Sequence, residues 1–266
     1  MNKHPAQFRL VGDNSIANLT LQGQQLLATS SDSAKLDVEI LLSFVLDKAR
    51  SYLLTWPEKA LNDEQLLEFS HLLSRRSEGE PIAYLTGVKE FWSLPLAVSK
   101  ATLIPRPDTE TLVELVLDVY CDDKGMTCLD LGTGTGAIAL ALASEKNSWK
   151  IDATDFNADA VKLAQRNASN LNLTHVHIYQ SDWFEQISQT LKFDIIVSNP
   201  PYIDVNDINL SQGDVRFEPK SALVATEQGL ADIKHIADKA RDFLSTDGKL
   251  FFEHGFEQGH AVRSIL

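Results

Sequence analysis

The chain has 266 residues, of which 44% are hydrophobic and 23% charged, a composition typical of a folded globular protein with one large domain or two smaller ones. It has two cysteines, no apolar run of the ~20 residues that span a membrane, and no signal-peptide core after its first residues, so we expect a cytoplasmic protein without a disulfide framework. The net charge of −13 and the lack of a basic stripe argue against binding to duplex DNA and favour a protein or small-molecule substrate.

Residues 1–80 predict a small domain of three helices. Ser15 is a candidate N-cap for the first helix and Asn62 for the third, because their side chains can accept hydrogen bonds from free backbone N–H groups. The second, strongly apolar helix is predicted to reach as far as Leu54 and to turn Asp37 outward. A bundle of this size buries a modest core, so we interpret it as a substrate-recognition domain rather than a catalytic one.

The pattern changes over residues 81–104, where apolar residues alternate between Gly87 and Val98 and predict a β-hairpin linker. The following Pro105 and Pro107 hold the chain extended, and Asp108 is a candidate N-cap for the next helix. Arg106, between the two prolines, is an exposed cation beside the expected cleft, and its role is open.

From residue 127 onward, short apolar runs alternate with helical patterns. Strands are expected at 128–131, 151–154, 176–179, 194–197 and 249–253. This alternation predicts an α/β fold with a doubly wound, mostly parallel sheet and helices on both faces. Residues 204–220 form a long polar loop, and such loops in compact domains are usually functional.

A glycine-rich loop joins the first of these strands to its helix, in the stretch Asp130-Leu131-Gly132-Thr133-Gly134-Thr135-Gly136. Glycine permits a tight turn and the close approach of a ligand to the backbone. The loop predicts a nucleotide-type ligand but leaves its identity open, because Gly132, Gly134 and Ala137 also fit the dinucleotide fingerprint. A glycine-rich turn without a ligand is the alternative.

Two further strand ends carry candidate donor-binding side chains. Asp155 follows Gly132 by 23 positions, where a carboxylate that accepts both ribose hydroxyls belongs, although it could instead cap the next helix. After the third strand, Asp182 could accept from an adenine amino group and Trp183 could cover the ring. A tryptophan that merely packs at the rim is the competing interpretation.

The stretch Asn199-Pro200-Pro201-Tyr202 ends the fourth strand, at the edge where open α/β sheets bind ligands. The Asn199 side-chain oxygen and the Pro200 carbonyl could together accept both hydrogens of a planar NH₂ group, on which Tyr202 could stack. Two acceptors orient such a weakly nucleophilic nitrogen, and no strong base is needed before it attacks. The pattern predicts methyl transfer from a sulfonium donor by positioning and electrostatics, with Asn199, Pro200 and Tyr202 as catalytic residues.

In these two motifs the chain resembles the S-adenosylmethionine-dependent methyltransferases that act on planar nitrogens. Three more stretches make it similar to the bacterial peptide chain release factor glutamine N5-methyltransferases, over the chain from about Leu36 onward: Glu90-Phe91-Trp92, Leu103-Ile104-Pro105-Arg106-Pro107-Asp108-Thr109-Glu110 and Arg216-Phe217-Glu218-Pro219. The resemblance implies methylation of the glutamine in the Gly-Gly-Gln motif of class 1 release factors.

The resemblance also implies how the chain is divided: a helical domain at 1–80, a hairpin linker at 81–104, and a class I S-adenosylmethionine methyltransferase domain at 105–266. In that family two further strands, a closing antiparallel hairpin, follow the position of Leu266, so we expect residues 105–266 to lack that hairpin. By position, Gly132 to Gly136, Asp155 and Trp183 would bind the methyl donor. Asn199 would touch donor and glutamine, and Pro200, Pro201 and Tyr202 would hold the glutamine amide.

Other functions stay open at this point. An adenine N6 or ribosomal-protein glutamine methyltransferase would also use a planar nitrogen, and a nicotinamide-dependent dehydrogenase is permitted by the glycines but lacks a proton donor at Asn199.

We expect release factors as the protein partner, no direct nucleic acid or membrane partner, and a monomer. His175 and His177 lie two positions apart without a trusted ligand spacing, so no metal is expected.

Overall fold

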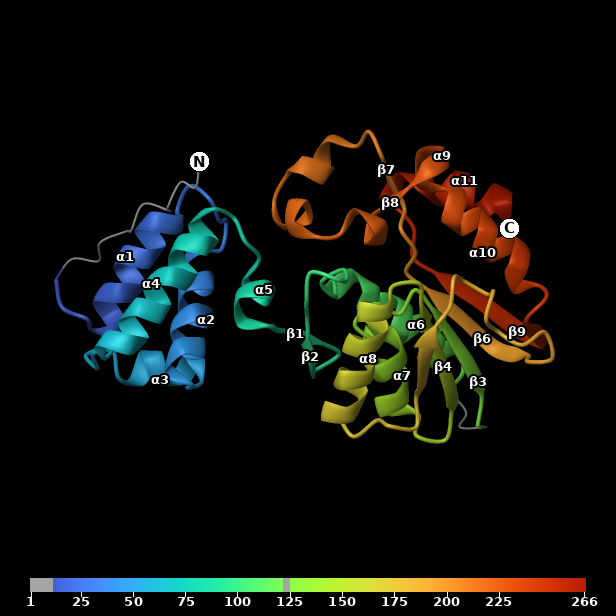
Figure 1. Ribbon diagram of the computed structural model, residues 1–266, viewed down its shortest axis with the longest axis horizontal. Coiled ribbons are helices and arrows are strands. Elements are labelled where there is room, and N and C mark those ends of the chain that lie inside the picture. The colour runs from blue at the N-terminus through green and yellow to red at the C-terminus, as the bar shows by residue number, and fades with distance from the viewer. Residues whose placement is uncertain (1–11, 122–124) are drawn as a thin grey trace. The chain divides into compact units, whose positions relative to one another are not determined.

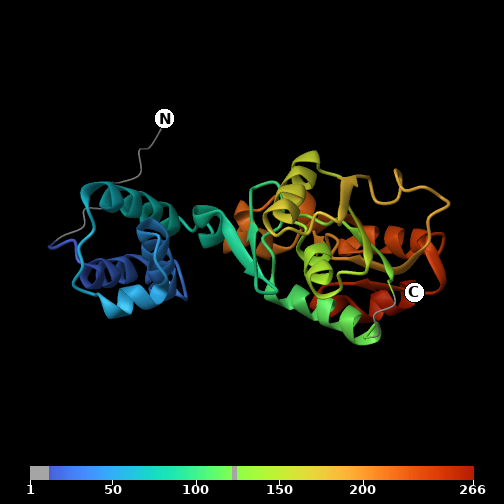
Figure 2. The same cartoon turned by 90° about the horizontal axis from the view of Figure 1, so that it is seen from below.

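The computed structural model describes residues 12–121 and 125–266, and the chain divides into two units between Gly87 and Val88 (Figure 1). The first unit is helical, as Figure 2 shows in blue to cyan. Its helices are α1 (Ile16–Leu27), α2 (Ala34–Leu46), α3 (Arg50–Thr55), α4 (Asp63–Ser77) and α5 (Ile82–Thr86).

Both predicted caps of this unit are confirmed. The Ser15 side chain accepts a hydrogen bond from the Asn18 backbone N–H, and Asn62 and Gln65 form a reciprocal capping box at the start of α4. The second helix is shorter than predicted, because Asp47 adopts a left-handed conformation that ends α2.

The outward orientation predicted for Asp37 is wrong. Asp37 is 4% exposed, and its carboxylate accepts a hydrogen bond from Arg76 Nε at 2.7 Å and from the hydroxyls of Ser31 and Ser33. A buried carboxylate is tolerated when it is paired and hydrogen-bonded. Arg76 lies on α4, far along the chain, so the local sequence pattern held no sign of this partner.

Close packing of α1 on α2 explains the glycine within α1. A Cβ at Gly23 would lie 2.8 Å from a methyl carbon of Val38, so any larger residue would push the helices apart. Val38, Leu41 and Leu42 of α2 are fully buried in this core, whereas Phe44 is 44% exposed. The core of the helical unit therefore depends on a face of α2 that periodicity alone did not single out.

The second unit begins with the predicted hairpin, strands β1 (Val88–Phe91) and β2 (Leu94–Ala97), which pair antiparallel. Its two turn residues, Trp92 and Ser93, have positive φ angles, as tight hairpin turns require. The Trp92 backbone N–H donates to the Glu110 carboxylate at 2.8 Å. Asn167 of α8 (Ala158–Asn170) bonds both backbone groups of Ala97, so the hairpin is fastened to the rest of this unit.

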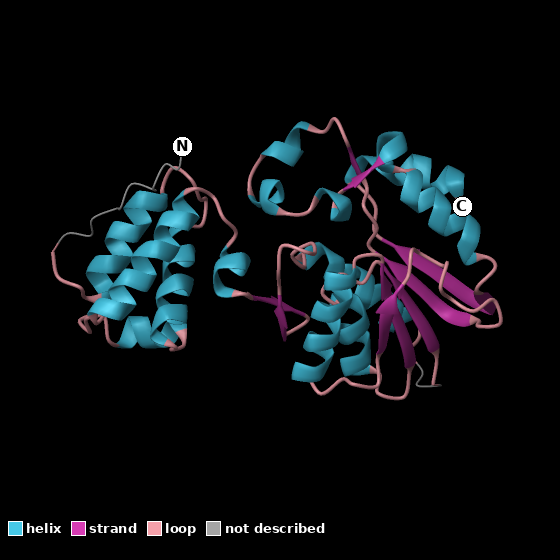
Figure 3. Ribbon diagram, viewed as in Figure 1, coloured by secondary structure: helices cyan, strands magenta, loops and turns pink. Residues whose placement is uncertain are grey.

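Five parallel strands form the main sheet in the order β5-β4-β3-β6-β9, and helices lie on both of its sides (Figure 3). They are β3 (Thr127–Leu131), β4 (Lys150–Asp155), β5 (His177–Gln180), β6 (Phe193–Ser198) and β9 (Leu244–Phe252). The predicted doubly wound α/β fold is confirmed. The chain runs outward from β3 through β4 to β5 and then returns to β6, so the strand order reverses between β3 and β6. Open α/β sheets bind ligands beyond the carboxyl ends of the two strands between which the order reverses.

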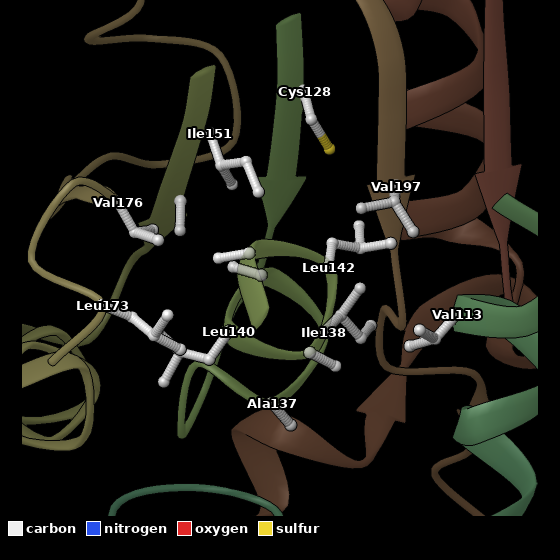
Figure 4. Packing of buried hydrophobic residues seen from close by; sticks show 14 of the residues in the cluster. Val113, Cys128, Ala137, Ile138, Leu140, Leu142, Ile151, Leu173, Val176 and Val197 are labelled. Atoms are coloured by element: carbon white, nitrogen blue, oxygen red, sulfur yellow. The ribbon is translucent and has the colours of Figure 1, made fainter. Parts of the chain in front are cut away.

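Alternate residues of the strands supply two separate cores. On one face, Cys128 packs with α6 (Glu110–Val119), α7 (Ala137–Glu145) and α8. Figure 4 shows this face, where Ile138, Leu140 and Leu142 of α7 lie among strand and loop side chains. On the other face, Leu129 packs with α10 (Ala231–Ala240). Because both faces are covered, the strands are apolar along their whole length.

The helix predicted to be capped by Asp108 begins later than expected. A short 3₁₀ turn, η1 (Pro107–Thr109), precedes α6, and no side-chain hydrogen bond caps either element. That cap prediction is wrong, because Pro107 starts a tighter turn before the α-helix can form.

The predicted long polar loop joins two short parallel strands, β7 (Ile203–Asp204) and β8 (Val224–Ala225), through three 3₁₀ turns. These turns are η2 (Ile208–Ser211), η3 (Asp214–Phe217) and η4 (Lys220–Ala222). The remaining elements are α9 (Thr226–Gly229), η5 (Phe256–Gln258) and α11 (Gly259–Ile265). In the described part of the chain, no helix is both long and apolar enough to cross a membrane.

Candidate active site

A cavity of about 330 Å³ opens at the carboxyl ends of β3, β4 and β6, within the second unit. Its walls come from the loops that follow these strands, together with the segment before α6 and part of the loop between β7 and β8. The cavity therefore sits where the sheet topology places ligands. Its lining includes the glycine-rich loop, three carboxylates, aromatic side chains and one guanidinium.

Asp130, which is completely buried, supports the glycine-rich loop. One of its oxygens, Oδ2, accepts from Thr133 Oγ1 at 2.6 Å and from the Ala139 backbone N–H at 3.2 Å. The other, Oδ1, has no hydrogen-bond partner among the described residues. Burial raises the pKa of Asp130 to about 7, because ionisation costs more away from water.

Asp155 joins the glycine-rich loop to the end of β4. Its carboxylate accepts the Gly134 backbone N–H at 2.9 Å and the Asn157 backbone N–H at 2.8 Å. The cap of α8 is Asn157, whose side chain accepts from the Asp159 N–H, so Asp155 does not have the helix-cap role that was its alternative. Burial raises the pKa of Asp155, and each of its oxygens keeps a second lone pair for a ligand.

Aromatic side chains form two walls of the cavity. Trp183 has a φ of +45° and lies across the loop, 3.6 Å from the position that a Cβ would take at Gly132. Phe156, which the sequence interpretation missed, is 67% exposed and also lines the cavity. Its position directly after Asp155 was the available signal. An exposed aromatic ring beside a candidate ribose site suits a flat heterocycle.

A chain of hydrogen bonds connects Asn199 to the residue that follows β9. Asn199 Nδ2 donates to Thr109 Oγ1 at 3.0 Å, and Thr109 Oγ1 donates to Glu253 Oε2 at 2.7 Å. The Tyr202 hydroxyl donates to the other oxygen of Glu253 at 2.8 Å. Neither Thr109 nor Glu253 was assigned a role from the sequence.

The structure brings most of the predicted site residues to one cavity. Those that line it are Gly132, Thr133, Gly134, Thr135, Asp155, Asp182, Trp183, Asn199 and Pro201. Gly136, Pro200 and Tyr202 do not. Gly136 instead packs against α7 and α8, Pro200 is buried, and burial together with Glu253 raises the pKa of Tyr202, which keeps its phenol neutral.

Arg106, whose role was open, lines the cavity and forms an ion pair with Glu218. The Glu218 side chain is fully buried, and its second oxygen accepts the Ile104 backbone N–H at 2.9 Å. This carboxylate therefore fastens the segment before α6 to the loop between β7 and β8. In the described part of the chain, no group of three or more His, Cys, Asp and Glu side chains is arranged to hold a metal ion.

Two family models match the chain. Residues 18–87 match the PrmC N-terminal domain, and residues 107–215 match the methyltransferase small domain. The second match contains the glycine-rich loop, Asp155 and Asn199.

Curated proteins named release factor glutamine methyltransferase are similar over most of their length. The protein of Aliivibrio fischeri is 56% identical over 252 residues, which are 95% of this chain and 86% of that protein. The protein of Escherichia coli is 56% identical over 237 residues, 89% of this chain and 85% of that protein. Among solved structures, a methyltransferase from Pyrococcus furiosus has the same fold, with a TM-score of 0.50 at 19% identity over 74% of this chain and 85% of that one.

Proposed function

The chain belongs to the family of release factor glutamine methyltransferases, and we propose that it methylates the side-chain amide nitrogen, N5, of the glutamine in the Gly-Gly-Gln motif of peptide chain release factors. The family predicted from the sequence motifs is thereby confirmed. Membership makes S-adenosylmethionine the methyl donor and a release factor the substrate.

The observation that carries the proposed site is the meeting of two loops at one cavity. The glycine-rich loop after β3 and Asn199 after β6 both line it, on adjacent strands of the sheet. The chemistry of the walls fits an adenosine with a charged tail, since Asp155 can accept ribose hydroxyls and Trp183 and Phe156 can cover a base. Asp182, which also lines the cavity, would accept from the adenine amino group.

The turn after β6 would form the side of the site that receives the glutamine. Asn199 and Pro201 line the cavity. Asn199 Oδ1 would accept one hydrogen of the glutamine amide, and the carbonyl of Pro200, which lies behind this lining, would accept the other. The Tyr202 ring, with its hydroxyl fixed on Glu253, would pack on the amide plane. Holding the amide in this way aims its nitrogen lone pair at the methyl carbon without a strong base in the site.

The donor supplies an electrophilic methyl group on a sulfonium. With the donor bound, the glutamine nitrogen would form a bond to the methyl carbon as the sulfur–carbon bond breaks, and the nitrogen would then lose a proton to solvent. The protein's contribution is orientation and a water-poor, polar surrounding, which are the main sources of rate when the nucleophile is uncharged before attack.

A labelled-methyl assay tests this proposal. Purified release factor, the same factor with Gln→Ala in Gly-Gly-Gln, ribosomal protein and DNA would each be offered with methyl-labelled S-adenosylmethionine. We expect label on the unchanged release factor alone, with fragment mass spectra that place it on the glutamine side chain. Label on the Gln→Ala factor would refute the Gly-Gly-Gln assignment, and label on DNA or ribosomal protein would favour the other planar-nitrogen substrates.

A further inference from the structure

We propose that Glu253, acting through Thr109, fixes which way round the Asn199 amide lies, so that its oxygen rather than its nitrogen meets the substrate. Thr109 and Glu253 are then positioning residues for methyl transfer. The inference rests on the proposed role of Asn199 as an acceptor for the glutamine NH₂ group.

The direction of the hydrogen bonds carries the inference. A threonine hydroxyl has one hydrogen, and a carboxylate can only accept. Because Thr109 Oγ1 lies 2.7 Å from Glu253 Oε2, its hydrogen is directed to the carboxylate. Thr109 can therefore only accept from Asn199, which turns Nδ2 toward Thr109 at 3.0 Å and leaves Oδ1 for the cavity.

The network is held in place on several sides. Thr109 is 4% exposed, so water does not compete readily for its hydroxyl. The Glu253 backbone N–H donates to the Ser198 carbonyl at 3.0 Å, directly before Asn199 in the chain. The same residue's carboxylate receives the Tyr202 hydroxyl at 2.8 Å. One residue thus fixes both ends of the turn that would hold the glutamine.

An inverted Asn199 amide would present N–H groups to the N–H groups of the glutamine. Two donors cannot bond to each other, so the nucleophile would lose one of its two orienting contacts. Without the Thr109 hydroxyl, both orientations of the Asn199 amide become accessible. The expected consequence is slower methyl transfer with little change in donor affinity.

The test compares Thr109→Val, which keeps the shape and removes the hydroxyl, with Thr109→Ser, which keeps the hydroxyl. We expect Thr109→Val to lower kcat about tenfold to a hundredfold, as for other members of a coupled hydrogen-bond network. We expect Thr109→Ser to stay within about threefold of the unchanged enzyme. The Kd for S-adenosylmethionine, measured by calorimetry, should not change in either variant.

Thr127 provides a matched control. It is the first residue of β3, at the end of that strand away from the cavity. Its hydroxyl also donates to a carboxylate, Asp194 Oδ2 at 2.8 Å, and accepts an N–H, from the Asp194 backbone at 3.1 Å. Thr127→Val should therefore lower stability without lowering kcat. An equal loss of kcat in Thr127→Val and Thr109→Val would show that the effect is general destabilisation and would overturn the proposal.

A double-mutant cycle tests whether Thr109 acts through Asn199. In an Asn199→Ala background, Thr109→Val should have no further effect on single-turnover methyl transfer, because there is no amide left to orient. Full additivity in the cycle would refute the inference.

A second measurement does not depend on turnover. The Asn199 side-chain N–H groups, followed by ¹⁵N NMR, should exchange more slowly than those of an exposed asparagine such as Asn172, and Thr109→Val should abolish this protection. Unprotected Asn199 protons in the unchanged enzyme would contradict the proposed orientation. If the enzyme failed to methylate release factors, the NMR result would still decide how the amide lies.

Discussion

Replacing Asp130 by Asn should change how the stability of the second unit depends on pH. In the folded protein, burial raises the pKa of Asp130 from 3.8 to about 7. The ionised form is then about 4 kcal/mol less favourable in the folded than in the unfolded chain, at about 1.4 kcal/mol for each tenfold change. The asparagine of the Asp130→Asn variant would keep an oxygen for the Thr133 hydroxyl and the Ala139 N–H, and it does not ionise.

The direction follows from proton binding. Between about pH 4 and 7 the folded protein keeps a proton on Asp130 that the unfolded chain has released, so the free energy of unfolding falls as the pH rises through this window. Above the folded pKa the loss is complete. About 3 kcal/mol of this decrease in the free energy of unfolding occurs between about pH 5 and 8, a range in which the protein can be handled without acid unfolding. The stability of the Asn variant relative to the unchanged protein should therefore rise by about 3 kcal/mol over this range.

Urea titrations at several pH values, followed by near-UV circular dichroism, measure this difference. Asp194→Asn is the control, because the pKa of Asp194 moves the other way: burial opposes its ionisation, but hydrogen bonds from Thr127 and Ser245 lower the pKa overall. Stability gained from a lowered pKa is complete above about pH 5, so the control difference should be flat from there to about pH 8. A flat difference for Asp130→Asn as well would refute the neutral, buried carboxyl beneath the glycine-rich loop.

Three further substitutions address the site. Asn199→Ala should lower kcat by about 10² or more while the Kd for S-adenosylmethionine stays within about threefold, since one orienting acceptor is lost; equal turnover in label-transfer assays would remove Asn199 from the mechanism. Asp155→Ala should weaken donor binding by about tenfold or more, because a charged acceptor is lost, and calorimetry giving an unchanged Kd would leave Asp155 as a loop anchor only. Gly229→Ala should disorder the turn after β6, because its Cβ would lie 2.0 Å from the Tyr202 carbonyl oxygen at a φ of +80°; a thermal unfolding temperature equal to that of the unchanged protein would contradict that contact.

The sheet and its helices could be predicted because their signals are local. Apolar runs such as the one that ends at Val197 are buried on both faces of a parallel sheet, and glycines mark the tight loop after β3. The face of α2 could not be predicted, because that helix is apolar on several sides and its partners decide which side is buried. Asp37 shows the same limit, since its partner Arg76 is 39 residues away.

Within the site, the residues at strand ends could be predicted and those that support them could not. Asn199 and Asp155 stand at the ends of apolar runs, where the fold itself gives them a place. Thr109 and Glu253 are 144 residues apart. Thr109 lies in the stretch from Leu103 to Glu110 that carries the family resemblance, but that stretch gave its hydroxyl no role, and Glu253 follows its strand without any motif. Their meeting depends on β9 pairing beside β6, a long-range event that spacing along the chain does not encode.

The place of Glu253 in the chain sets an order of events during synthesis. A ribosome makes the glycine-rich loop, Asp155 and Asn199 first, and Glu253 follows Asn199 by 54 residues. Among the described residues β9 pairs with β6 alone, at one end of the strand order, so the other four strands of the sheet can pair before it emerges. With the site as proposed, a nascent chain would acquire its donor-binding loops before it acquires the Glu253 carboxylate, and the orientation of the Asn199 amide would be fixed only after β9 has been made.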